Sequence, residues 1–93
     1  MKAIIIDDER LARTELKKLL QEFPEIEVID EAANADEGIT KIDSQHPDLI
    51  FLDIQMPGLT GLQLIQSLSN RPMIILITAY EKFALEGFNL DVV

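Results

Sequence analysis

The sequence predicts an α/β domain built on a parallel β-sheet. Three short runs carry this prediction, and each consists only of apolar residues: 4–6, 49–52 and 73–77. Unbroken runs of this kind are typical of strands that are buried on both faces, as parallel strands are. Segments with helical spacing of apolar residues separate the runs, so strand and helix alternate along the chain.

Composition narrows the classes of protein. A chain of 93 residues is long enough for one domain with its own core. It has no cysteine, which excludes disulfides and fits a reducing, cytoplasmic location. No apolar run approaches the ~20 residues of a membrane-spanning helix, so we expect no contact with a membrane. The formal net charge of −9 argues against direct binding of nucleic acid, and it allows several carboxylates to crowd into one cation site.

The first third of the chain predicts a strand, a helix and an edge strand. The strand is Lys2–Ile6, and the helix that follows runs from Leu11 until Pro24 stops it. The predicted apolar face of this helix consists of Leu11, Ala12, Leu16, Leu19, Leu20 and Phe23. A short second strand covers residues 26–29, and its acidic neighbours suit the edge of a sheet.

The middle of the chain predicts a capped helix and a central strand. Asn34 and Glu37 have the spacing of an N-cap residue and a capping-box acid, so we expect a helix from there to about Gln45. His46 and Pro47 end it. The strand over residues 49–53 then places a single carboxylate, that of Asp53, at its carboxyl end, before a turn at Pro57 and Gly58.

The last part of the chain predicts two more helices around one strand. Thr60 is placed to cap the first of them. The inward residues of that helix are Leu62, Leu64, Ile65 and Leu68. After a turn, the strand Met73–Ile77 ends at Thr78, and a fourth helix covers residues 81–88. Residues 91–93 begin a further element.

Acidic residues follow two of the predicted strands where these strands end. Parallel strands deliver their carboxyl ends to one edge of a sheet, where ligands bind in α/β folds. Asp7 and Asp8 therefore meet Asp53 in one crevice if their strands are neighbours. Carboxylates so close raise one another's pKa and destabilise the fold, and a divalent cation removes that penalty. Hard oxygen ligands select Mg²⁺ or a similar ion.

Such a site suits phosphoryl transfer. A carboxylate is able to act as a nucleophile and form an aspartyl phosphate, which makes Asp53 the candidate acceptor. Transfer depends mostly on positioning and on neutralising the charge of the moving oxygens. Mg²⁺ between Asp8, Asp53 and the phosphoryl group would supply part of this, and the Thr78 hydroxyl would supply a hydrogen-bond donor. The alternatives are an Asp53 that caps a turn, an acidic loop at 7–9 and a Thr78 that is only a strand end.

Three segments together resemble the receiver domain of bacterial two-component response regulators. They are 4–9 (IIIDDE), 52–61 (LDIQMPGLTG) and 77–79 (ITA), in this order and spacing. The resemblance implies a flavodoxin-like fold with strand order 2-1-3-4-5. It implies phosphorylation of Asp53 by a sensor histidine kinase. It also implies that Mg²⁺ is bound by Asp8, Asp53 and the backbone carbonyl of Gln55, that Asp7 assists through water, and that Thr78 is the switch hydroxyl.

The resemblance also implies an output outside this chain. Residues 78–88 are similar to those of regulators whose output is a LytTR-type DNA-binding domain. In such a protein the receiver switches transcription and is not itself an enzyme. A switch role for Tyr80 stays open beside a surface or core position.

The chain departs from the family pattern at its C-terminal end. The family places a Lys at the end of its fifth strand and an aromatic residue earlier in it, and the sequence ends at Val93 before either. We therefore expect a receiver domain over 1–93 that lacks strand 5 and helix 5. The outer edge of the strand at 73–77 would then be open. An open apolar edge favours dimers or exchange of a segment with a second molecule.

The same residues also allow two other functions. A degenerate receiver that only binds partners would lose acidic ligands, and all three are present here. A phosphatase of the haloacid-dehalogenase kind would need a second acid two residues after the nucleophile, where Gln55 stands. His46 has no partner constellation and is rejected as a phosphoryl donor or metal ligand. Gly58 and Gly61 lack the context of a nucleotide-binding loop.

Overall fold

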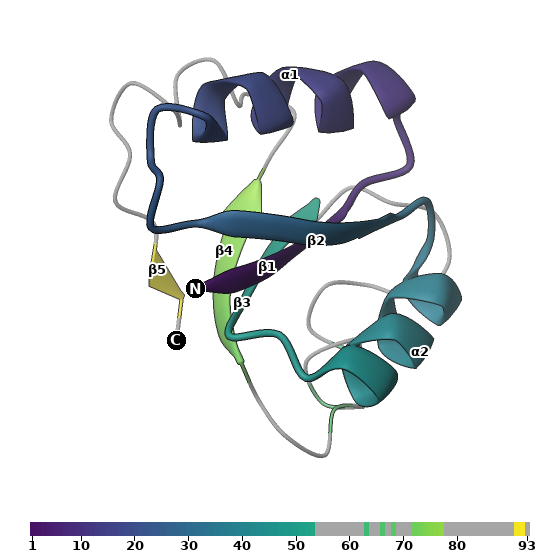
Figure 1. Ribbon diagram of the computed structural model, residues 1–93. Coiled ribbons are helices and arrows are strands. Elements are labelled where there is room, and N and C mark those ends of the chain that lie inside the picture. The colour runs from purple at the N-terminus through teal and green to yellow at the C-terminus, as the bar shows by residue number, and fades with distance from the viewer. Residues whose placement is uncertain (54–62, 64–65, 67, 69–71, 78–90, 93) are drawn as a thin grey trace.

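The computed structural model describes residues 1–53, 63, 66, 68, 72–77 and 91–92 (Figure 1). The elements in chain order are β1 (Lys2–Ile6), α1 (Arg10–Leu20), β2 (Glu27–Ala32), α2 (Ala35–Gln45), β3 (Leu49–Asp53), β4 (Met73–Ile77) and β5 (Asp91–Val92). Of the helix predicted after Thr60, the structure describes the helical, exposed Gln63 and Gln66 and the buried Leu68. The predicted helix over 81–88 lies outside the described residues.

The sheet has the order β2-β1-β3-β4-β5. The pairs β1–β2, β1–β3 and β3–β4 are parallel, which confirms the predicted 2-1-3-4 order and the flavodoxin-like fold. α1 lies on one side of the sheet and α2 on the other, as right-handed crossovers require (Figure 1). The carboxyl ends of the four parallel strands therefore point to one edge of the sheet.

The core has two layers, one on each face of the sheet. One layer contains Ile4, Ile6, Ile50, Leu52, Leu68 and Ile74 together with Ala32 and, from α2, Ala35 and Ile42. The other contains Ala3, Ile5, Leu49, Phe51, Ile75 and Ile77 together with Leu16 and Leu20 of α1. Successive residues of a strand alternate between the two layers, because side chains in a strand point to opposite faces. This double burial explains why the strands are unbroken apolar runs.

α1 differs from the predicted helix at both ends. It ends at Leu20, and Phe23 is 46% exposed in the turn that follows. Leu11 is 75% exposed. At ~100° per residue, Leu11 lies about 140° around the helix from Leu16 and cannot share its face. The apolar face of α1 is therefore narrower than predicted, with Leu16 and Leu20 at its centre.

β2 is longer than the predicted strand because two acidic residues continue it. Asp30 and Glu31 pair with Ile4 and Ile5 of β1, after a register shift that leaves one extra residue in β2. The apolar pattern predicts the strand only over residues 26–29. Here Lys41 of α2 binds Asp30, and α1 binds Glu31 through Arg13 and Lys17. These ion pairs attach both helices to the edge strand.

The predicted cap of α2 is confirmed. Asn34 Oδ1 accepts a hydrogen bond from the backbone N–H of Glu37 at 2.8 Å. The Glu37 carboxylate accepts in turn from the backbone N–H of Ala33 at 3.3 Å. The helix ends where predicted, at His46, whose φ of 50° and ψ of 60° are left-handed. The His46 N–H donates to the carbonyl of Ile42.

The expectation of an open edge at β4 is wrong over part of its length. Asp91 pairs with Ile75, and Val92 pairs with Ile74. The two strands are antiparallel, so β5 is not the parallel fifth strand that the resemblance implies. The chain's own residues cover this stretch of β4 without a second molecule, and exchange of a segment is not needed there. None of the described helices is long and apolar enough to cross a membrane.

Candidate functional site

The candidate site lies where β1 and β3 end. Ile6 of β1 pairs with Leu52 of β3, so the next residue of each strand, Asp7 and Asp53, comes to the same edge. Asp8 follows Asp7 directly. Each of the three side chains offers a carboxylate oxygen within 4.8 Å of those of the other two. The structure thus brings together the three carboxylates that the sequence analysis placed in one crevice.

Asp7 is the most constrained of the three acids. It is 3% exposed. Its backbone N–H donates to the carbonyl of Ala32 in β2 at 3.0 Å. Its carboxylate oxygen Oδ1 accepts from the backbone N–H of Glu9 at 2.9 Å, which closes the turn into α1. Asp8 in that turn is exposed and Asp53 is partly buried, so the cluster has one buried side and one side open to solvent.

Burial raises the pKa of the Asp7 carboxyl from 3.8 to about 7. The hydrogen bond from Glu9 opposes this shift, whereas the charge of Asp53, a hydrogen bond with it and the charge of Asp8 add to it. Near neutral pH the Asp7 carboxyl therefore holds a proton for much of the time. A proton on Asp7 removes one negative charge from the cluster and so relieves the repulsion that a bound cation would also relieve.

The donor set fits a magnesium ion. All three side chains are carboxylates, and no His or Cys belongs to the cluster among the described residues. Two oxygens that each lie about 2.1 Å from one octahedral Mg²⁺ are about 3 Å apart in neighbouring positions and about 4.2 Å apart in opposite ones. Oxygens within 4.8 Å of one another need only a small approach, or one bridging water, to reach that geometry.

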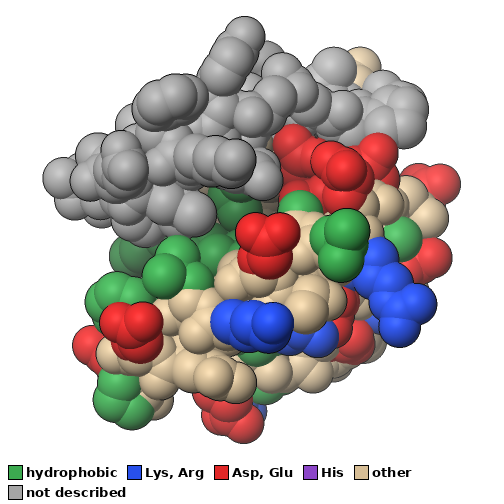
Figure 2. Space-filling model, turned by 90° about the horizontal axis from the view of Figure 1, so that it is seen from above, with side chains coloured by type: hydrophobic (Ala, Val, Ile, Leu, Met, Phe, Trp, Pro, Cys, Tyr) green, Lys and Arg blue, Asp and Glu red, His purple; other side chains and the backbone are tan. Residues whose placement is uncertain are grey.

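Charge on this side of the molecule is also arranged for a cation. Figure 2 looks down on the α1 side and shows a dense group of acidic side chains at one edge, with basic side chains apart from it. The chain as a whole carries 17 acidic and 8 basic residues, so its field attracts cations.

Sequence reasoning missed Arg13 at this site. Its Nη1 donates to the backbone carbonyl of Asp7 at 2.7 Å, and its Nε donates to Glu31 Oε1 at 2.8 Å. The available signal was a basic residue one helical turn after the acidic segment at 7–9. Helical pattern alone placed Arg13 only off the apolar face.

Two residues with predicted roles lie outside the described residues. They are Gln55, whose carbonyl the resemblance assigns to Mg²⁺, and Thr78, the expected switch hydroxyl. The same holds for Tyr80. Their roles stay predictions, and the site that the structure describes is the carboxylate cluster with Arg13 behind it.

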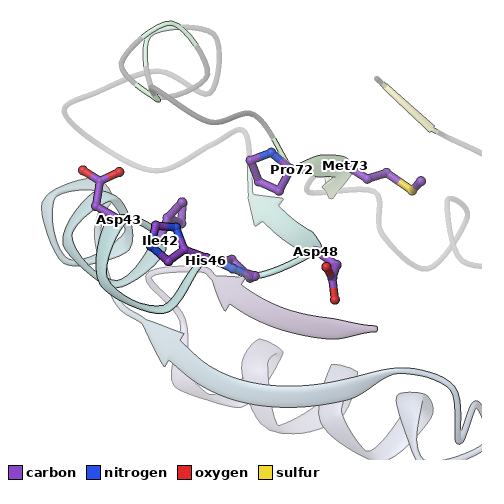
Figure 3. Close-up of a pocket in the computed structure, with 7 residues that line it drawn as sticks. Ile42, Asp43, His46, Asp48, Pro72 and Met73 are labelled. Atoms are coloured by element: carbon purple, nitrogen blue, oxygen red, sulfur yellow. The ribbon is translucent and has the colours of Figure 1, made fainter.

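A pocket of about 490 Å³ lies elsewhere, at the edge where β3 and β4 begin (Figure 3). It is lined by Ile42, Asp43, His46, Pro47, Asp48, Pro72 and Met73. The carboxylate of Asp48 accepts from the backbone N–H of Lys2. His46 is in none of the metal-ligand groups found among the described residues. The pocket is at the opposite end of the strands from the acid cluster.

Comparison with known proteins identifies the family. Residues 3–92 match the model of the response regulator receiver domain, so the chain belongs to that family. It is 43% identical over 90 residues to the transcriptional regulatory protein BtsR of Escherichia coli (strain K12). The matched residues make up 95% of this chain and 38% of that protein.

Solved structures agree with this assignment. The response regulatory domain of MrkE from Klebsiella pneumoniae matches with a TM-score of 0.74 and 34% identity, over 97% of this chain and 76% of that one. CheY6 in its complex with the P1 domain of CheA3 from R. sphaeroides matches with a TM-score of 0.73 and 27% identity, over 91% of this chain and 74% of that one. The chain spans less than two fifths of the length of the curated relatives it matches first.

Proposed function

We propose that this receiver domain accepts a phosphoryl group on Asp53 from a sensor histidine kinase, with Mg²⁺ bound beside it. The carboxylate cluster carries the proposal: Asp7, Asp8 and Asp53 converge at the carboxyl ends of neighbouring parallel strands. A purely structural Asp53 would not need two further acids within 4.8 Å. The complex of a similar receiver with the P1 domain of CheA3 supports a kinase as the partner.

In the transfer, an oxygen of Asp53 attacks the phosphorus of a phosphohistidine. The P–N bond breaks, the imidazole keeps the bonding electrons and takes up a proton, and an acyl phosphate forms on Asp53. Asp8, Asp53 and the Gln55 carbonyl would hold Mg²⁺, and Asp7 would act through a water. The ion would neutralise charge on the transferred oxygens. Thr78 would donate its hydroxyl to the phosphoryl group and couple the site to the rest of the domain.

The output of this switch lies beyond the chain. The similarity to a transcriptional regulatory protein supports control of transcription. The resemblance of residues 78–88 leads us to propose a DNA-binding output domain of the LytTR type. The receiver itself turns over no substrate in this scheme, and the protein works in the cytoplasm, where the kinase domain is found. A phosphatase is disfavoured by Gln55 at the position of the second acid.

Mass spectrometry of the full-length protein tests the proposal. With acetyl phosphate and Mg²⁺, one phosphoryl group should add to the peptide that contains Asp53, and hydroxylamine should remove it as it removes an acyl phosphate. Asp53→Asn should abolish the addition, because an amide is not a nucleophile of this kind. The same group on a Ser, a Thr or His46 would contradict the assignment.

A further inference from the structure

Arg13 connects the acid cluster to the edge strand. Its guanidinium makes two contacts in different directions: Nη1 donates to the carbonyl of Asp7 at 2.7 Å and Nε to Glu31 Oε1 at 2.8 Å. Its side chain is only 15% exposed, so the two hydrogen bonds are largely shielded from water. A planar fork with several donors is suited to hold two acceptors at a fixed separation.

The far end of this connection is itself fixed. Glu31 pairs with Ile5 of β1, and its second carboxylate oxygen binds Lys17, one turn further along α1 than Arg13. The hydrogen bonds from Lys17 and Arg13 lower the pKa of the Glu31 carboxyl, so it stays charged at neutral pH. Glu31 is thus an anchored anion on β2 rather than a loose surface acid.

The result is that β2 holds Asp7 by both of its backbone polar groups. The Asp7 N–H donates directly to the carbonyl of Ala32 at 3.0 Å. The Asp7 carbonyl is held through Arg13 by Glu31, the residue before Ala32 in the strand. The peptide planes on both sides of Asp7 are therefore constrained, and with them the direction in which Asp8 leaves β1.

We propose that Arg13 is a positioning residue for the metal site: held by Glu31, it fixes the Asp7 carbonyl and so presents the carboxylates of Asp7 and Asp8 to a divalent cation. The inference rests on the proposed function, because it concerns the same site. Arg13 has no contact with the three carboxylates among the hydrogen bonds described, so its action is through the backbone.

Charge and position make opposite predictions for the removal of Arg13. A positive side chain behind an acid cluster repels an incoming cation, so its loss by charge alone would strengthen Mg²⁺ binding. Loss of a group that orients metal ligands typically weakens metal binding 10- to 100-fold. The direction of the change in Mg²⁺ affinity therefore distinguishes a positioning role of Arg13 from a purely electrostatic one. A variant that is less stable but still folded would not show a weaker Mg²⁺ affinity for that reason alone.

The experiment measures the Kd of Mg²⁺ by calorimetry on the full-length protein and its variants. We expect Arg13→Met to weaken binding about 10-fold. Arg13→Lys should weaken it similarly, because an ammonium keeps the charge but lacks the fixed separation between the Nη1 and Nε donors. Lys18→Met, which removes an exposed charge from the same helix, should stay within about twofold.

A second readout needs no metal. The backbone N–H of Glu9 donates to Asp7 Oδ1, so its hydrogen exchange reports on the order of the turn. Without Mg²⁺, exchange at Glu9 should be faster in Arg13→Met than in the parent and unchanged in Lys18→Met. This measurement keeps the inference testable in a variant of lower stability, because the change should be local to residues 7–9.

The outcomes separate the two proposals. Unchanged or tighter Mg²⁺ binding by Arg13→Met, in a parent that binds the ion, would overturn the positioning role and leave the proposed function intact. Equal weakening in Lys18→Met would also overturn it, since the effect would then not depend on the contact of Arg13 with the Asp7 carbonyl. A parent that binds no Mg²⁺ at millimolar concentration would overturn both.

Discussion

Asp7 shows at the scale of one residue how a binding site stores unfavourable free energy. Its carboxyl is buried beside two other acids, and its pKa is raised to about 7. The ordinary cost of a buried carboxylate is removed either by a proton or by a cation. The buried carboxyl of Asp7 therefore favours binding of a proton or a metal ion. It also lowers the stability of the metal-free fold.

This state predicts the pH dependence of stability without metal. The folded protein holds the Asp7 proton up to about pH 7, whereas the unfolded chain releases it near pH 3.8. The folded state thus binds more protons between these values, so the free energy of unfolding should fall as pH rises from about 4 to 7. Above about pH 7 this contribution should be constant.

Urea unfolding in EDTA at several pH values measures this dependence. Between pH 5 and 7 Asp30 and Glu31 do not interfere, because hydrogen bonds from Gln45 and Lys17 lower the pKa of these carboxyls from 3.8 and 4.5, so their contribution is constant above these values and is lost only as the pH falls through and below them. Asp7→Asn should flatten the fall, since the amide does not titrate. A parent whose stability is flat or rising from pH 5 to 7, relative to Asp7→Asn, would contradict the raised pKa.

At the scale of elements, local patterns predicted what depends on neighbours in sequence. The apolar runs gave β1, β3 and β4, and the Asn34 cap gave the start of α2. The order of the strands and the convergence of Asp7, Asp8 and Asp53 followed from the rules for parallel sheets. These features need only the chain's periodicity and the known handedness of crossovers.

The features that the sequence did not predict depend on partners that are distant in sequence. β2 continues through Asp30 and Glu31 because Arg13, Lys17 and Lys41, 11 to 18 residues distant, neutralise the two acids. No local pattern contains that information. Arg13 is only six residues from Asp7, but the acid that holds its guanidinium, Glu31, is 18 residues away. The antiparallel pairing of β5 with β4 likewise joins segments that are distant in sequence.

Gly38 of α2 gives a prediction at the element scale. A Cβ added there would lie 2.6 Å from Cδ1 of Ile6, a fully buried residue next to Asp7. Alanine would gain up to ~1 kcal/mol of helix propensity. Overpacking in a closed core typically costs about 1–3 kcal/mol, so Gly38→Ala should destabilise the domain by about 1 kcal/mol net.

The midpoints of denaturant unfolding measure this difference in stability between Gly38→Ala and the parent, provided that the slope of the free energy against denaturant concentration is the same. Ser44→Ala is the matched control, because Ser44 is exposed on the same helix and should gain a few tenths of a kcal/mol. A Gly38→Ala variant stabilised as much as Ser44→Ala would show that Ile6 moves aside at no cost, and that the approach of α2 to β1 is not close-packed.

At the scale of the whole molecule, two different electrostatic effects act on stability. The net charge of −9 makes the folded chain repel itself, and any salt screens that repulsion. The cluster of Asp7, Asp8 and Asp53 adds a local repulsion that a bound divalent ion relieves directly. A melting experiment separates the general effect from the local one if the ionic strength is matched.

We expect Mg²⁺ to raise the Tm of the metal-free protein more than NaCl at equal ionic strength. Binding to the folded state alone stabilises by RT ln(1 + [L]/Kd), about 1.4 kcal/mol at tenfold Kd. Asp8→Asn and Asp53→Asn should lose this excess while keeping the response to NaCl, because each removes one ligand from the same site. In the absence of metal these two variants should be at least as stable as the parent, since one like charge is gone from the cluster. Equal responses to the two salts in the parent would mean that both salts only screen the repulsion between its carboxylates and that these carboxylates do not form a metal site.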